Sequence, residues 1–157
     1  MIELELHDPG RQEDLGRRLA PLLSGPCLVF LAGELGTGKT TIVRGILAGL
    51  GHRGAVRSPT YTLVEPYELG GRAVFHLDLY RLGDPEELEY LGLRDMLSDD
   101  NLLLVEWPER GAVALPTADV SVELAYAGAR ARKIRLEGLT GRGRAILAGT
   151  PYQSSRK

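Results

Sequence analysis

Hydrophobic positions along this chain of 157 residues recur with two different periods, which predict alternating strands and helices. Apolar and polar residues alternate over residues 2–6, 120–126 and 134–136, as in strands with one buried face. Residues 27–31 and 102–105 are instead continuous apolar runs, which are typical of strands buried on both faces of a parallel sheet. The pattern therefore predicts a sheet with both a buried parallel part and more exposed strands.

Helical spacing appears in three segments between these strands. Asp8-Pro9 provides an N-cap and a first-turn proline for a helix that Ser24-Gly25-Pro26 ends. A second helix follows residue 38 and is closed by Gly51, and a third is expected to start at Asp84-Pro85. The segment 144–148 is a further short element whose type the pattern leaves open.

Two hairpins complete the predicted elements. The Gly70-Gly71 turn joins apolar segments at 63–69 and 72–78, and a second hairpin joins 120–126 to 134–136. The order of strands and helices indicates an α/β fold with a mixed β-sheet flanked by helices and a hairpin-rich C-terminal part. We expect a single domain over residues 1–151, followed by a flexible tail at residues 152–157.

The segment between the apolar run at 27–31 and the second helix carries the strongest chemical signal. It fits the phosphate-binding pattern G-x-x-x-x-G-K-[ST], in which glycines let backbone N–H groups surround a phosphate, lysine reaches the outer phosphates and a hydroxyl binds Mg²⁺. The alternative, a glycine-rich turn with a surface lysine, is disfavoured because the required strand and helix flank the motif. We therefore expect a P-loop NTPase-like sheet whose ATP-binding residues are Gly33, Leu35, Gly36, Thr37, Gly38, Lys39, Thr40 and Thr41.

Two carboxylates follow apolar strands at the places where a P-loop protein needs an acid. Asp78 follows residues 74–77, and Glu106 follows residues 102–105. Because the carboxyl ends of parallel strands converge on the ligand, either residue could lie beside Mg²⁺, and a surface acid at a strand end is the alternative. Glu106 is the stronger metal candidate, together with Thr40, because its strand is the more apolar. Lys39, Asp78 and Glu106 are the predicted catalytic residues.

Four further side chains lie in or near these motifs. Thr60 and Thr62 belong to a hydroxyl-rich segment that either forms a switch-like loop touching the γ-phosphate or is ordinary turn chemistry. Trp107 is the only tryptophan, and it either fills the core or contacts a ligand or partner. We interpret His76 as a strand residue with satisfied hydrogen bonds and not as a catalytic base.

Composition narrows the class of protein. The net charge of −2 gives no overall basic field for nucleic acid or membranes, but the charge is uneven. Residues 84–109 contain nine acidic and one basic side chain, and residues 128–157 contain eight basic and one acidic. Both segments could simply be solvated faces. Alternatively, the acidic segment docks a partner, and some arginines of the basic segment face the nucleotide.

The remaining composition points to a cytoplasmic protein. Cys27 is the only cysteine, so we expect a small buried thiol, with neither an internal disulfide nor a zinc site. The first residues lack the pattern of a signal peptide, and no apolar run approaches membrane-spanning length. We therefore expect a cytoplasmic location and no membrane partner.

Four motifs together resemble a known family. The P-loop segment 33–41, Ser-Pro-Thr-Tyr-Thr-Leu-Val-Glu at 58–65, His-Leu-Asp-Leu-Tyr-Arg-Leu at 76–82 and Val-Glu-Trp-Pro-Glu at 105–109 stand in the order and spacing of the TsaE (YjeE) family. These are bacterial ATPases required for the threonylcarbamoyladenosine modification of tRNA. The resemblance extends from the first helix to the late hairpin.

The resemblance implies a Mg²⁺-dependent accessory ATPase that binds a TsaB–TsaD heterodimer and resets it between turnovers. TsaD would transfer the threonylcarbamoyl group to the adenosine next to the anticodon, in tRNAs reading codons that begin with A, so tRNA would be met through the complex. It also implies that Lys39 binds phosphates, that Thr40 and Glu106 bind Mg²⁺, and that Asp78 is the Walker-B-like acid. A residue near the start of the first helix, within 7–10, and an arginine of the late hairpin, Arg130 or Arg132, would also meet the nucleotide.

Three rival functions remain. A P-loop kinase for a small metabolite would carry an arginine-bearing lid, yet no long basic insertion lies between Thr41 and Leu102. A GTPase would need an Asn-Lys-x-Asp motif, which the chain lacks. A nucleotide sensor without useful turnover is disfavoured by the pair Asp78 and Glu106. The kinase is the leading alternative to the ATPase.

Overall fold

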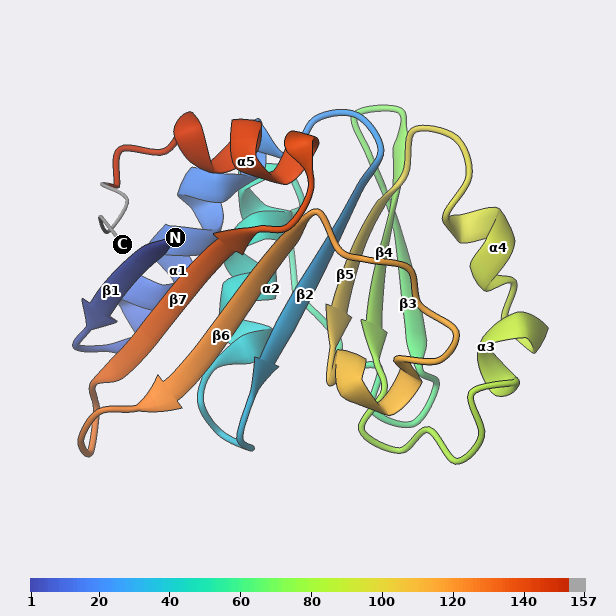
Figure 1. The fold of residues 1–157 in the computed structure, drawn as a ribbon, viewed down its shortest axis with the longest axis horizontal. Coiled ribbons are helices and arrows are strands. Elements are labelled where there is room, and N and C mark those ends of the chain that lie inside the picture. Colours follow the sequence, from blue (N-terminus) through green and yellow to red (C-terminus); the bar gives the residue numbers. More distant parts are fainter. Residues whose placement is uncertain (153–157) are drawn as a thin grey trace.

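The structure, a computed structural model that describes residues 1–152, is a seven-stranded sheet with helices on both faces (Figure 1). The elements in chain order are β1 (Ile2–Leu6), α1 (Pro9–Leu19), η1 (Ala20–Leu22), β2 (Cys27–Gly33), α2 (Lys39–Gly49), β3 (Val64–Leu69), β4 (Arg72–Asp78), α3 (Glu87–Tyr90), α4 (Leu93–Met96), β5 (Leu102–Glu106), η2 (Pro108–Gly111), β6 (Val120–Tyr126), β7 (Arg132–Gly138) and α5 (Gly141–Ala148).

The sheet is mixed, with strand order β1-β7-β6-β2-β5-β4-β3. The four central strands β6, β2, β5 and β4 are parallel, and antiparallel partners extend the sheet at both ends. The predicted α/β fold with a mixed sheet, and both predicted hairpins, are confirmed. Because the central strands run the same way, β2, β4 and β5 all end at one edge, the lower edge in Figure 1.

Alternate residues of the central strands fill two separate cores. Leu102 and Leu104 of β5 face a core that includes α1, α2 and α5, while Leu103 and Val105 face one that includes α3 and α4. This two-sided burial explains the continuous apolar runs at 27–31 and 102–105. Glu106 continues the alternation of Leu102 and Leu104, so it is directed to the α2 side of the sheet.

Helices α1 and α2 pack with their backbones unusually close, behind the sheet in Figure 1. A Cβ added at Gly16 would come within 2.3 Å of the Ile42 carbonyl oxygen, and one at Gly45 within 2.1 Å of that of Glu13. Only glycine permits this approach. The contact fixes the start of α1 next to the start of α2, and it thereby brings a side chain of α1 under the P-loop.

The structure corrects one of the local predictions, completes a second and confirms a third. The helix expected from Asp84-Pro85 is two short helices, because Gly92 between them adopts a left-handed conformation with φ of +87°. The segment 144–148 is part of helix α5, whose first N–H groups include one bonded to the capping Thr140 side chain. Cys27 is buried, as predicted.

One residue of the predicted tail packs against the rest of the chain. Tyr152, which the sequence assigns to a tail, is partly buried and packs against the α1–α2–α5 core. The rest of that predicted tail, residues 153–157, lies outside the described residues. Within residues 1–152, none of the helices has the length and hydropathy needed to cross a membrane.

Candidate functional site

The P-loop connects β2 to α2 at the edge where the parallel strands end. Gly36 and Gly38 have φ of +80° and +105°, values that side-chain-bearing residues adopt only with strain. The Thr37 backbone N–H and hydroxyl both donate to the Glu34 carbonyl oxygen, at 3.2 and 2.7 Å, which closes the loop into a tight turn. Gly38 then forms the N-cap of α2, so the positive end of the helix opens into the loop.

Lys39 is folded back over this loop. Its Nζ donates to the carbonyl oxygens of Gly33 at 2.6 Å and Glu34 at 3.0 Å, and it lies 4.2 Å from the centre of the Trp107 ring. Burial lowers the pKa of the Lys39 ammonium, against an opposing effect of nearby carboxylates, Glu106 first among them. The ammonium is therefore poorly solvated, which favours its interaction with any anion that enters the loop.

Three side chains from distant elements brace the P-loop. Gln12 of α1 is 3% exposed, and its Nε2 donates to the Thr37 carbonyl oxygen at 2.8 Å. On the other side, the Tyr126 hydroxyl donates to the Leu35 carbonyl oxygen, and the Arg132 guanidinium lies 4.6 Å from the Tyr126 ring centre and 3.5 Å from the Gly36 carbonyl oxygen. The loop is thus held from below by α1 and at its tip by the late hairpin.

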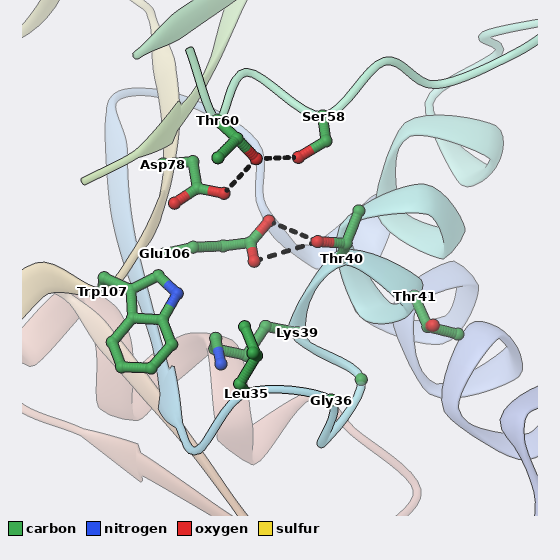
Figure 2. Close-up of a pocket in the computed structure, with 11 residues that line it drawn as sticks. Leu35, Gly36, Lys39, Thr40, Thr41, Ser58, Thr60, Asp78, Glu106 and Trp107 are labelled. Carbon is green, nitrogen blue, oxygen red and sulfur yellow. Dashed lines mark hydrogen bonds between the residues drawn. The ribbon is translucent and has the colours of Figure 1, made fainter. Parts of the chain in front are cut away.

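The predicted metal pair is in direct contact. The Thr40 hydroxyl lies 3.0 and 2.9 Å from the two carboxylate oxygens of Glu106 (Figure 2). Glu106 pairs in register with Leu31 of β2 on one side and with Asp78 of β4 on the other, so the strand order alone brings it beside the P-loop. Its Oε2 also lies 2.6 Å from His76 Nε2.

Asp78 occupies the same cleft and has its own set of donors. Its carboxylate accepts from the Tyr80 backbone N–H at 3.1 Å and from the Thr60 hydroxyl at 3.5 Å, and Thr60 is 2.8 Å from the Ser58 hydroxyl (Figure 2). Burial raises the pKa of Asp78, and the neighbouring Glu106 carboxylate adds to the effect, while the Tyr80 and Thr60 hydrogen bonds oppose it. A carboxylate with a raised pKa is a better proton acceptor near neutral pH.

Together these groups surround a cleft of about 320 Å³. Leu35, 66% exposed, forms part of its rim. Trp107 packs against the α3–α4 core and the Tyr80 ring, as one interpretation of the sequence expects, and it also lines the cleft. The residues that line it are Leu35, Gly36, Gly38, Lys39, Thr40, Thr41, Ser58, Thr60, Asp78, Glu106 and Trp107.

Some candidate residues are placed differently from the rest. Thr62 is exposed and bonds the Val64 carbonyl oxygen, outside the lining of the cleft, whereas Thr60 faces it. Arg130 is exposed in the β6–β7 turn, and among residues 1–152 it has no hydrogen bond or ion pair, while Arg132 reaches the P-loop. The Thr41 side chain points away from Glu106 (Figure 2).

Sequence reasoning missed two residues at the site. Gln12 lies just beyond the region 7–10, where Asp8 instead caps α1 by accepting from the Arg11 N–H. His76 is a buried strand residue, as interpreted, but its hydrogen bonds are not all satisfied: Nε2 bonds Glu106, and Nδ1 has no partner among residues 1–152. The sequence did carry a signal for placing His76 near the site. His76 precedes Asp78 by two positions, and residues two apart in a strand lie on the same face of the sheet.

The cleft has the chemistry to hold a nucleotide and a hard cation. Glycine backbone and the α2 N-terminus could surround phosphates, with Lys39 as the counter-charge. The Thr40 hydroxyl and the Glu106 carboxylate could hold Mg²⁺, which prefers oxygen ligands and needs few from the protein when phosphates and water supply the others.

Comparison with known proteins agrees with this geometry. Residues 6–134 match the family described as threonylcarbamoyl adenosine biosynthesis protein TsaE. Proteins named "tRNA threonylcarbamoyladenosine biosynthesis protein TsaE" are similar to the chain: one from Haemophilus influenzae is 50% identical over 121 residues, covering 77% of this chain and 76% of that protein. Another, from Streptomyces coelicolor, is 50% identical over 99 residues, covering 61% and 66%.

A solved structure shares the fold. The crystal structure of YdiB from Bacillus subtilis superposes with a TM-score of 0.80 at 24% sequence identity, covering 94% of both chains. The family match spans most of the chain and includes the P-loop, both strand-end carboxylates and Trp107. The chain therefore belongs to the TsaE family.

Proposed function

We propose that this protein is a Mg²⁺-dependent ATPase needed for threonylcarbamoylation of adenosine in tRNA. It would act in the cytoplasm with TsaB and TsaD homologues, as an accessory ATPase that resets their complex, on tRNAs reading codons that begin with A. Family membership supports the tRNA-modification role. The observation that carries the ATPase part is the contact of Thr40 with both oxygens of Glu106 beside the P-loop.

Four side chains of the cleft have defined tasks in this proposal. ATP, when bound, would supply the phosphoanhydride, and Mg²⁺ would supply positive charge beside its oxygens. Lys39, which donates to the carbonyl oxygens of Gly33 and Glu34, would donate to phosphate oxygens instead, and Thr40 and Glu106 would hold the metal. Asp78 orients a water and accepts its proton at the carboxylate, helped by the burial that raises its pKa.

The partner component is tested by a phosphate-release assay on the purified chain, alone and with TsaB and TsaD homologues. We expect slow hydrolysis by the chain alone, a changed rate with the partners and co-elution on gel filtration in ATP. A tRNA modification assay on the same complex then tests the pathway. An unchanged rate together with separate elution would refute the partner model and leave the hydrolytic site to be judged by mutation.

The hydrolytic component is tested by Lys39→Ala and Glu106→Ala. Both should abolish turnover, and Lys39→Ala should also weaken nucleotide binding because phosphate contacts are lost. Glu109→Ala is a matched control, since Glu109 is an exposed acid of the same motif that does not line the cleft. Normal turnover by Glu106→Ala would show that the metal assignment is wrong.

A further inference from the structure

His76 is a fully buried polar residue whose hydrogen bond is made to the proposed metal site. It lies on β4 with 0% exposure, and its Nε2 is 2.6 Å from Glu106 Oε2. His76 pairs in register with Leu104 of β5, two residues before the Asp78–Glu106 pair. It therefore approaches Glu106 from behind the cleft and does not line the cleft itself.

The pattern of hydrogen bonds defines the role of each ring nitrogen. Glu106 accepts at Oε2 from His76, and its two oxygens also receive the Thr40 hydroxyl. The carboxylate is an acceptor, so the imidazole proton lies on Nε2. Nδ1 is buried and has no hydrogen-bond partner among residues 1–152, which fits its being the unprotonated nitrogen of that tautomer.

We propose that His76 is a positioning residue, which holds the Glu106 carboxylate in the orientation that binds Mg²⁺. This inference rests on the proposed function of the same cleft. The Glu106 side chain extends from the end of β5, and only Thr40 and His76 restrain its carboxylate within the described part of the chain. When a metal engages the Thr40 hydroxyl, the Nε2–H of His76 is the restraint that remains.

Donors behind a ligating carboxylate fix its rotation and so reduce the entropy lost on metal binding. Loss of such a partner costs about 10–100-fold in metal affinity or activity. The P-loop itself is untouched by His76, because its supports come from Gln12, Tyr126 and Arg132. The expected defect is therefore specific to the metal, and nucleotide binding without metal should be preserved.

Two amide substitutions separate positioning from packing. In His76→Gln the side-chain amide nitrogen takes the place of Nε2 and can still donate to Glu106. In His76→Asn it takes the place of Nδ1, on the side where the ring has no partner. The two variants introduce the same chemical group, but Asn fills less of the buried site than Gln. A loss of packing would lower ADP affinity both with and without Mg²⁺, whereas a loss of positioning lowers only the Mg²⁺-dependent part.

The test measures ADP affinity by calorimetry with and without Mg²⁺, and the Mg²⁺ concentration for half-maximal ATP hydrolysis. We expect His76→Asn to reduce the Mg²⁺-dependent gain in ADP affinity and to raise the half-maximal Mg²⁺ concentration by about 10–100-fold. His76→Gln should remain within a few-fold of the wild type on both. ADP affinity without Mg²⁺ should be equal in all three proteins.

If His76→Asn behaves like the wild type, the inference about His76 is overturned. The proposed metal site is not, because the wild type still responds to Mg²⁺. Loss of the Mg²⁺ effect in His76→Gln also overturns the inference about His76, and this result stands even if His76→Asn does not fold. A wild-type protein whose ADP affinity and turnover do not respond to Mg²⁺ refutes the proposed metal site itself, and the inference with it.

Discussion

The support of the P-loop by Gln12 leads to a quantitative prediction for Gly38→Ala. A Cβ at Gly38 would lie 2.2 Å from Gln12 Nε2, and the backbone there has φ of +105°. Gly54 has the same φ, but a Cβ there meets nothing within 4 Å. The two substitutions therefore share a backbone cost, and only Gly38→Ala adds a collision with a buried side chain.

The magnitude follows from the two contributions. An L-residue in a left-handed conformation costs about 1–2 kcal/mol, which is the whole expected effect of Gly54→Ala. In Gly38→Ala the Gln12 amide must also move and abandon its 2.8 Å bond to the Thr37 carbonyl oxygen, and an unsatisfied buried polar group costs about 1–3 kcal/mol. We expect a total of about 2–5 kcal/mol for Gly38→Ala.

Urea unfolding of the two single variants measures this difference, and ADP titration measures its effect on the loop. Nucleotide affinity should fall for Gly38→Ala and stay unchanged for Gly54→Ala. In a Gln12→Ala background the collision disappears, so Gly38→Ala should then cost no more than Gly54→Ala does. Equal destabilisation by the two single variants, or an additive double variant, would refute the role given to Gln12.

Three other predictions concern the cleft and the core. Lys39 Nζ lies 4.2 Å from the ring centre of the only tryptophan, so moving Lys39 onto a phosphate should change Trp107 fluorescence when ADP saturates the protein. Unchanged fluorescence while calorimetry detects ADP binding would contradict the movement of Lys39. Thr60→Val removes a hydrogen bond, worth about 1 kcal/mol, that orients the Asp78 carboxylate, so kcat should fall about fivefold even though the pKa of Asp78 rises further. Thr62→Val, outside the cleft, should leave kcat unchanged, and equal rates for the two variants would refute this role of Thr60. Burial raises the pKa of the Cys27 thiol to about 12. Above pH 9 the unfolded chain therefore releases this proton while the folded chain keeps it. The free energy of unfolding should then fall with rising pH, by up to about 1.4 kcal/mol per pH unit. Urea unfolding at pH 8 and pH 10 of the wild type and Cys27→Ala checks this, and the same pH dependence in both would contradict it.

The sequence by itself determined the elements and the phosphate-binding motif. Period-two alternation, helical spacing, the Gly70-Gly71 turn and the Asp8 cap act within a few residues, so their consequences can be read locally. The P-loop is also local, because its glycines and lysine lie in one turn between β2 and α2. The third helix was mispredicted because the left-handed Gly92 divides a segment whose leucines still keep helical spacing.

Only the tertiary structure decided which of the candidate side chains meet. The strand order places β5 between β2 and β4, and this register brings Glu106 to Thr40 and Asp78 to Glu106. It also selects between equivalent neighbours: Thr60 faces the cleft and Thr62 does not.

The partners that the sequence did not reveal lie on different elements of the fold. Gln12 reaches the P-loop through the glycine contact of α1 with α2, and His76 reaches Glu106 from the neighbouring strand β4. No local pattern encodes such contacts, because they follow from helix packing and strand register, which depend on burial of the whole core. Sequence thus determined the chemical groups of the site, and packing determined which of them act together.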